Sequence, residues 1–374
     1  MIGPNESSGA SINVLDWIDT TQESAIENVD AIISWLDAGS ADGKQSENES
    51  FTVNAKSVIK TVILAVLYSP ELSAREKNLA TVRDYLTRSD LKALLETIAA
   101  TDRKISFGAM QQLASQLLSI ASSHRTWSGV IAHVEQLTAW LSTPSLRRLV
   151  VGNRETPRLD DIISGRFDVF LSIPLKTLNA TPAVARLLLG SLLNGVYERY
   201  HRSGGTNART LFLLDEMPRL KRMELLETAR DAGRGYGVTL WAIVQDLGQL
   251  EKWYGKAGVR SWIENSQVRT FFGVNDVETA ETISKMLGKE TIETETQGKS
   301  HSQSSQAGKL FGQRSASTSY HRALVGKPLM TADEILTMKT ASNGTAEEQI
   351  IFRRGYKPFR TALAKYYEMP EFQL

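Results

Sequence analysis

The feature that most constrains the fold of this chain is a change in hydrophobic period near residue 150. From about Thr20 to Leu149, apolar residues recur every three or four positions, which is the spacing of one helix face. After Leu149, short apolar runs alternate with helix-length segments, with short connections between them. This alternation is typical of a parallel sheet covered by helices on both faces. The sequence therefore predicts an all-helical lobe followed by an α/β domain.

The α/β part contains four apolar runs of strand length, with helices expected between them. These runs are Phe167–Pro174, Arg209–Glu216, Val238–Gln245 and Gln267–Val274. The helix expected between the first and second of these runs has Thr181 at its cap and Pro182 at its first position, which favours a helix start. Thr20 with Glu23, and Thr331 with Glu334, have the spacing of a capping box at the start of a helix.

Two later segments differ from this pattern. The segment 296–322 is rich in Ser, Gln and Gly, and we expect a mobile loop there. The tail 347–368 indicates a strand and a short final element.

Composition limits the possible functions. The 374 residues include 43 Lys plus Arg and 42 Asp plus Glu, for a net charge of +1, so any basic binding site must be local. The absence of cysteine excludes disulfides and zinc thiolate sites and fits a reducing compartment. The longest apolar stretch, Ser57–Ser69, is interrupted by Lys60 and is too short to cross a bilayer. Met1–Ser11 lacks the features of a secretion signal, so we expect a soluble, cytoplasmic chain.

Candidate catalytic residues stand at the ends of the expected strands. The stretch TLFLLDEMPRL stops on Asp215 and Glu216, and two adjacent carboxylates at the edge of a core are unfavourable without a cation or a polarised water. In nucleotide hydrolysis, the first carboxylate of such a pair holds the magnesium shell, and the second orients the attacking water or accepts its proton. Taken alone, the pair has a plain alternative, since strands often end on acidic residues that begin a helix cap.

Two further features favour nucleotide chemistry. The glycines of ARDAGRGYG place Arg230 and Arg234 on an open turn, from which a guanidinium can reach the phosphate site of a neighbouring subunit. A solvated basic turn is an equally good interpretation of these residues alone. Gln245 ends the next strand, where its amide can sense a γ-phosphate or position water, although a lone Gln there is more often a surface residue.

The phosphate-binding loop GxxxxGK[ST] does not occur in the chain. The tripeptide GKS at Gly298–Ser300 is not such a loop, because Glu293 stands where the first glycine is needed. The histidines lack metal-site spacing, and neither a GxSxG elbow nor a Cys nucleophile is present.

Taken together, these motifs resemble the type IV secretion coupling proteins of the VirD4, TraG and TraD kind. The resemblance rests on the order INVLDWID, a helical insertion, FDVFLSIP, TLFLLDEMPRL, ARDAGRGYGVTLWAIVQDLGQL, NSQVRTFFGVNDVETAETISKMLG and GKPLMTADEIL, and it covers nearly the whole chain from Ile12. It implies a RecA-like P-loop NTPase sheet with an all-α inserted domain. Residues 1–19 would be a remnant of the nucleotide-binding domain, 20–149 the all-α domain, and 150–374 the C-terminal part of the nucleotide-binding domain.

The resemblance also assigns roles to single residues. Asp215 would be the Walker B residue that binds Mg²⁺ through water, and Glu216 the catalytic carboxylate. Arg234 would be the arginine finger supplied to the adjacent subunit, and Gln245 the γ-phosphate sensor. ATP and Mg²⁺ are the implied cofactors.

In this family the all-α domain is implicated in recognising relaxase bound to single-stranded DNA. The RecA-like domains form a homo-hexameric ring, held at the cytoplasmic side of the bacterial inner membrane by an N-terminal region and joined to type IV secretion channel components. This chain resembles the part that follows the transmembrane helices and the Walker A loop, so we expect it to be inactive alone.

Two alternatives remain. The first is a non-catalytic substrate-receptor module that binds relaxosome or effector proteins through the all-α domain. The second is another motor of the HerA or FtsK type, which the long helical insertion disfavours.

Overall fold

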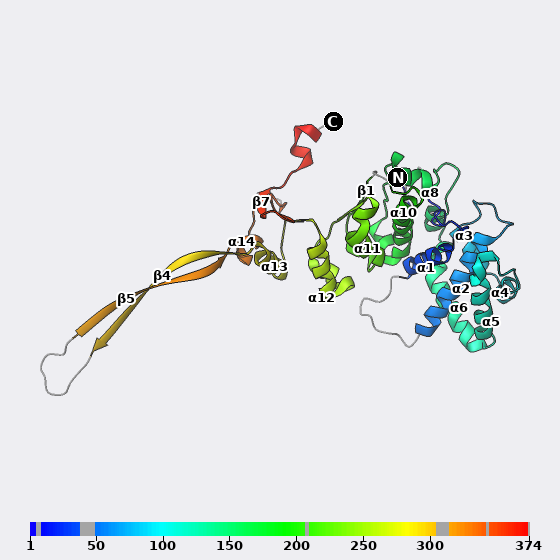
Figure 1. Ribbon diagram of the computed structural model, residues 1–374, viewed down its shortest axis with the longest axis horizontal. Coiled ribbons are helices and arrows are strands. Elements are labelled where there is room, and N and C mark those ends of the chain that lie inside the picture. Colours follow the sequence, from blue (N-terminus) through cyan, green and yellow to red (C-terminus); the bar gives the residue numbers. More distant parts are fainter. Residues whose placement is uncertain (5–8, 38–48, 206–208, 304–313, 342–343, 373–374) are drawn as a thin grey trace. The chain divides into compact units, whose positions relative to one another are not determined.

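The computed structural model describes residues 1–4, 9–37, 49–205, 209–303, 314–341 and 344–372. Its contacts divide the chain into two compact units, Met1–Asn265 and Ser266–Leu374 (Figure 1). The boundary between the units falls inside the segment 150–374, for which the sequence predicts a single domain. Each unit is described by itself below.

The first unit begins with the predicted helical lobe. In chain order its elements are α1 Ala25–Leu36, α2 Glu49–Tyr68, α3 Leu79–Leu86, α4 Leu91–Ala99, η1 Ile105–Gly108, α5 Ala109–Ala121, α6 His124–Thr138, η2 Ala139–Ser142, α7 Pro144–Arg147 and η3 Arg148–Val150. Helix α2 lies at the centre of the lobe and contacts α1, α3, α5 and α6. The lobe therefore buries its apolar stripes in a helix-on-helix core.

Two local predictions in the lobe need correction. The first helix begins at Ala25, because the carboxylate of Asp19 accepts hydrogen bonds from the backbone N–H and hydroxyl of Thr21 and holds Thr20 in a turn ahead of the helix. The second helix has 20 residues, longer than its apolar stretch. By length and composition α2 could cross a membrane, but half of its most apolar window is buried in the lobe, as expected for a core helix.

The rest of the first unit is α/β. Its elements are α8 Leu159–Asp161, η4 Ile162–Arg166, α9 Leu175–Ala180, α10 Pro182–Arg202, β1 Thr210–Leu214, η5 Met217–Leu220, α11 Glu224–Ala232, η6 Gly233–Tyr236, β2 Val238–Ala242 and α12 Leu247–Asn265. Strands β1 and β2 pair in parallel, with Phe212 opposite Leu240. Helix α10 is buried along most of its length and packs closely on α1, since a Cβ on Gly190 would lie 2.5 Å from the Trp35 ring.

The strand predicted at Phe167–Pro174 is wrong. Within the described residues this segment forms a single parallel bridge, between Leu171 and Ile2, and Phe170 is exposed. One bridge does not make a ladder, so an apolar run without neighbouring strands remains irregular. The face of the β1–β2 pair that carries Leu211, Leu213 and Trp241 is also exposed.

The second unit is built around an antiparallel sheet. Its elements are β3 Val268–Phe271, α13 Val277–Leu287, β4 Lys289–Gln303, β5 Arg314–Pro328, α14 Ala332–Leu336, β6 Glu348–Arg353, β7 Phe359–Ala362, η7 Tyr366–Glu368 and η8 Pro370–Phe372. The strand predicted around Gln267 is present as β3, but it pairs antiparallel with β6, which also pairs with β7. Thr331 and Glu334 form the predicted capping box of α14.

The segment 296–322 differs from the predicted loop. Strands β4 and β5 pair antiparallel from Lys289 opposite Pro328 to Gln303 opposite Arg314, and residues 304–313 lie outside the described residues. The hairpin extends away from α13 and α14 (Figure 1). Low hydrophobicity suggested a loop, but a hairpin satisfies its backbone groups through its own ladder and needs no buried face to pair.

Candidate functional site

The candidate site is formed where β1 and β2 end. The parallel ladder continues one step beyond the strands, because Ile243 N–H donates to the Leu214 carbonyl at 3.0 Å and Met217 N–H donates to the Ile243 carbonyl at 3.1 Å. These two bonds place Asp215 and Glu216 beside the residues that lead to Gln245. The carboxyl ends of neighbouring parallel strands thus meet at one edge of the sheet, as the sequence predicts.

Glu216 is held in a fixed and strained position. Its backbone is left-handed, with φ +54° and ψ +46°, a conformation that costs roughly 1–3 kcal/mol for a residue with a side chain. Its Oε1 accepts a hydrogen bond from Gln245 Nε2 at 2.8 Å, and its Oε2 accepts one from Arg219 Nε at 3.0 Å. The side chain of the following residue, Met217, is fully buried. Strain that the surroundings enforce in this way is common at functional sites.

Gln245 is itself oriented by a neighbour. Its Oε1 accepts a hydrogen bond from Gln249 Nε2 at 3.2 Å, while its Nε2 points to Glu216. The oxygen and the nitrogen of the Gln245 amide cannot exchange roles in this arrangement, because the Glu216 carboxylate only accepts. A movement of Gln245 therefore changes the environment of Glu216 directly.

Asp215 differs from Glu216. It is exposed, and within the described residues its carboxylate has no hydrogen bond or ion pair. No group of three or more His, Cys, Asp or Glu in that part of the chain could hold a metal ion. Mg²⁺ commonly binds through one or two carboxylates together with phosphates and water, so Asp215 fits a shared magnesium site and not an all-protein cage.

Arg219 was missed by the sequence analysis. It lies in η5, pairs with Glu216 and also donates to Asn179 Oδ1 at 3.3 Å. The signal was its position three residues after Glu216, which brings the two side chains together on a helical turn. Glu216 is thus neutralised from one side by a guanidinium of its own chain.

Arg234 lies at the opposite end of the strands. It belongs to η6, which precedes β2, and Thr210 N–H at the start of β1 donates to the Gly237 carbonyl at 2.9 Å. Five strand residues at about 3.3 Å each separate this end from the carboxylates by roughly 16 Å. Arg234 is exposed and, within the described residues, its side chain makes no ion pair. It therefore cannot serve the site formed by the carboxylates of its own chain.

The second arginine of this turn is not open to solvent. Only 7% of the Arg230 side chain is exposed, its Nε and Nη2 donate to the Asp231 carboxylate at 2.7 and 2.8 Å, and its guanidinium lies 4.7 Å from the centre of the Trp262 ring. The hydrogen bonds from Arg230 lower the pKa of Asp231. The prediction that Arg230 reaches outward is wrong, because it falls in the last turn of α11, ahead of the glycines.

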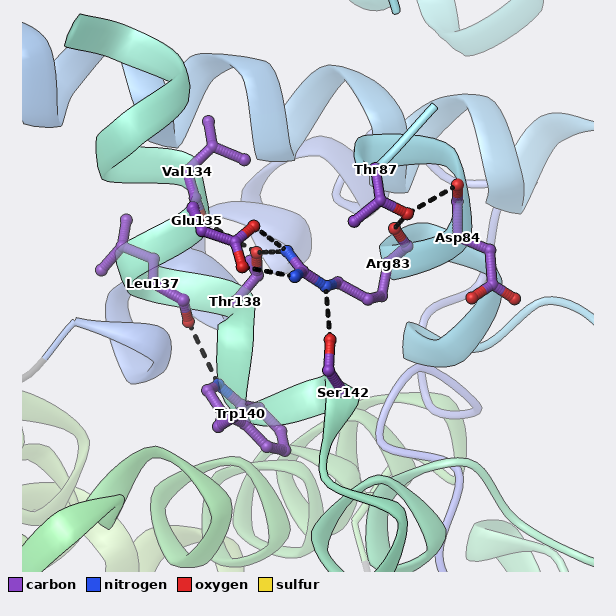
Figure 2. A network of polar contacts seen from close by, with 9 residues as sticks. All are labelled: Arg83, Asp84, Thr87, Val134, Glu135, Leu137, Thr138, Trp140 and Ser142. Atoms are coloured by element: carbon purple, nitrogen blue, oxygen red, sulfur yellow. Dashed lines mark hydrogen bonds and ion pairs between the residues drawn. The ribbon is translucent and has the colours of Figure 1, made fainter. Parts of the chain in front are cut away.

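A polar network ties the helical lobe together (Figure 2). Arg83 of α3 donates to both Glu135 oxygens at 2.7 and 2.6 Å, to Thr138 Oγ1 at 2.9 Å and to Ser142 Oγ at 3.2 Å. The Arg83 hydrogen bonds hold the pKa of Glu135 below its usual value. Since these partners belong to α6 and η2, this network fixes α3 against them.

Comparisons with known proteins agree with this architecture. The bacterial conjugative coupling protein TrwBdeltaN70, in its unbound form, superposes with a TM-score of 0.58 at 14% identity, covering 97% of this chain and 73% of that one. TrwB in complex with ADP and Mg²⁺ gives a TM-score of 0.57 at 13% identity, with the same coverage. The class of the fold is therefore that of the RecA-like coupling proteins, with an all-α domain, as predicted.

The family follows from sequence. The family model for type IV secretory system conjugative DNA transfer matches residues 3–374, and the chain belongs to this family. The TraG conjugal transfer protein of Rhizobium radiobacter is 33% identical over 96% of this chain and 52% of its own length. The VirD4 coupling protein of Bartonella quintana is 31% identical over 99% of this chain and 55% of its own. The chain spans about half the length of these relatives.

Proposed function

We propose that this chain is the part of an ATP-driven conjugative coupling protein that supplies the catalytic carboxylates, the arginine finger and the γ-phosphate sensor. The observation that carries the proposal is the strained Glu216, held between Gln245 and Arg219 beside the unpaired carboxylate of Asp215. The TrwB structures with ADP and Mg²⁺, and with the ATP analogue ADPNP, support nucleotide as the ligand class.

Each residue has a distinct task in this proposal. Asp215 would hold Mg²⁺ through water, and the ion would supply positive charge to neutralise the phosphates. Glu216 orients the attacking water and accepts its proton, which requires that its carboxylate stay ionised and fixed. Gln245 contacts Glu216 and lies at the end of the neighbouring strand, so it can report the state of the γ-phosphate to that strand.

Arg234 acts on a neighbouring copy. Its distance from Glu216 supports a role in trans, in which one subunit places its guanidinium against the nucleotide of the next. A closed ring, such as a homo-hexamer, gives every subunit one complete site. GxxxxGK[ST] does not occur in these 374 residues, so in this proposal the phosphate-binding loop is supplied by residues of the complete coupling protein that are not among them.

In the same proposal, the helical lobe of residues 20–149 recognises cargo. Its partners are the relaxase with single-stranded DNA and components of the type IV secretion channel, on the cytoplasmic side of the bacterial inner membrane. The family names of the relatives support this class of partner. The family assignment also supports a coupling protein over a motor of the HerA or FtsK type.

The test is ATP hydrolysis by the complete coupling protein that contains this chain. We expect Glu216→Gln to abolish hydrolysis while nucleotide binding, measured with a fluorescent ATP analogue, remains. Glu224→Gln is the matched control, because Glu224 is also acidic and nearby but its side chain is 85% exposed. Ordinary turnover by the 374-residue chain alone, lost on Glu216→Gln, would refute the need for an external phosphate loop.

A second candidate is a non-catalytic receptor for relaxosome or effector proteins. The observation in its favour is that GxxxxGK[ST] is missing from the sequence, while helices α1, α3, α5 and α6 of the lobe all pack against α2. The receptor would be favoured if the chain binds relaxase without nucleotide and Glu216→Gln leaves that binding unchanged. In the complete protein, Glu216→Gln should then also leave the rate of ATP hydrolysis unaltered.

A further inference from the structure

Arg186 of α10 is a buried cation that the proposed chemistry does not use. It is 3% exposed, and its guanidinium has five N–H groups, all of which donate to backbone carbonyls. The acceptors are Trp35 at 3.0 Å, Ser34 at 2.9 Å, Asp37 at 3.3 Å, Leu220 at 3.0 Å and Arg222 at 2.5 Å. Burial lowers the pKa of Arg186. A charge this deep requires complete hydrogen bonding, and the carbonyls supply it.

Three of these carbonyls belong to the end of α1. The last carbonyls of a helix have no partner within the helix, so the guanidinium acts as a cap there. The Asp37 carboxylate, at the same end, forms an ion pair with Lys56 of α2 at 2.7 Å. This side of Arg186 is therefore anchored in the helical lobe.

The other two carbonyls flank Lys221, directly after η5. Lys221 has φ +60° and ψ −160°, a backbone conformation that a residue with a side chain rarely adopts, so its surroundings must enforce it. Nη1 of Arg186 binds the carbonyls on both sides of it, and the Tyr254 hydroxyl accepts from Met223 N–H at 3.3 Å. Between Glu216 and this point lies only the short turn η5, which carries Arg219.

We propose that Arg186 is a positioning residue for Glu216. Arg186 fixes the segment Met217–Met223 against the end of α1. Since Arg219 belongs to this segment, its guanidinium is thereby held against the Glu216 carboxylate. Arg186 thereby joins the helical lobe to the catalytic carboxylate through backbone contacts. This inference rests on the proposed role of Glu216 and adds to it a residue outside the strand-end motifs.

Hydrogen–deuterium exchange of the full 374-residue chain tests the positioning. We expect Arg186→Met to speed amide exchange in 217–223 by about ten- to a hundredfold, as expected for lost charge-assisted hydrogen bonds. Arg83→Met is the matched control, since Arg83 is also a buried arginine, with four side-chain hydrogen bonds to residues of α6 and η2 in the helical lobe. Because its hydrogen-bond partners lie in α6 and η2, it should speed exchange in 217–223 less than Arg186→Met does. Equal acceleration in both variants, or none in Arg186→Met, would overturn the proposal.

A milder variant separates positioning from folding. Arg186→Lys keeps the positive charge but loses donors, and in the complete coupling protein it should lower kcat for ATP at least tenfold while KM stays within about twofold. A parallel change in kcat and KM, or no change, contradicts the positioning role. If Glu216→Gln also leaves hydrolysis intact, the proposed function has failed, whereas the exchange experiment still decides whether Arg186 holds the turn.

Discussion

The Arg83 network allows one stability prediction to be worked through. Arg83→Met keeps most of the apolar stem and removes a guanidinium whose side chain is 7% exposed. The Glu135 carboxylate is 54% exposed and can be rehydrated, so the ion pair itself contributes at most about 1 kcal/mol. The lost bonds to Thr138 and Ser142 contribute roughly another 1 kcal/mol together. We therefore expect a loss of about 2 kcal/mol in the free energy of unfolding.

The pH dependence of this loss follows from Glu135. Its folded pKa is below the unfolded value because Arg83 donates to it, so the stabilisation is present above the unfolded value of 4.5 and is lost as pH falls through the folded pKa. Urea unfolding should show the full difference between wild type and Arg83→Met near neutral pH and a smaller one below about pH 4. Arg88→Met, which removes an exposed ion pair with Asp90, should cost clearly less, because solvent screens that pair. A loss in Arg83→Met no larger than that, or one that grows in acid, would refute this reasoning.

Three further predictions concern the site and the core. Gln245→Glu places a second carboxylate 2.8 Å from Glu216, where the two like charges repel. ATP hydrolysis by the complete protein should therefore fall at least tenfold at neutral pH. Unaltered turnover would show that Gln245 does not belong to the site. Arg234→Ala should reduce hydrolysis by about 10³-fold or more with nucleotide binding nearly intact, and a joint loss of binding and hydrolysis would contradict the finger role. Gly190→Ala introduces a Cβ 2.5 Å from the Trp35 ring and should destabilise the first unit by about 1–3 kcal/mol in urea unfolding, whereas Gly235→Ala, where a Cβ meets open space, should not.

The sequence predicted what depends on local pattern. The helical lobe, β1, β2 and the meeting of Glu216 with Gln245 follow from periodicity and from the geometry of parallel strands. Phe167–Pro174 was mispredicted because an apolar run becomes a strand only if a neighbour pairs with it. Composition misled at 296–303 and 314–322, where β4 and β5 pair as an antiparallel hairpin.

Contacts between residues far apart in the chain were the other part of the structure that the sequence did not predict. Nothing near Arg186 in sequence indicates that it binds carbonyls about 150 residues earlier and more than 30 residues later. Arg230 and Arg234 look equivalent in the sequence, but Arg230 lies in the last turn of α11, where it donates to Asp231 and stacks on Trp262, whereas Arg234 lies in η6. Buried polar groups are satisfied by whatever the fold brings near, which a single sequence does not state.

The separation of Arg234 from Glu216 along the length of β2 has a genetic consequence. If each active site takes its carboxylate from one subunit and its guanidinium from the next, two defective alleles can complement each other. A mixed ring of Glu216→Gln and Arg234→Ala subunits contains some interfaces at which both functional residues meet, although neither variant alone has any. Co-expression of the two would then partly rescue transfer, in proportion to how often neighbours alternate.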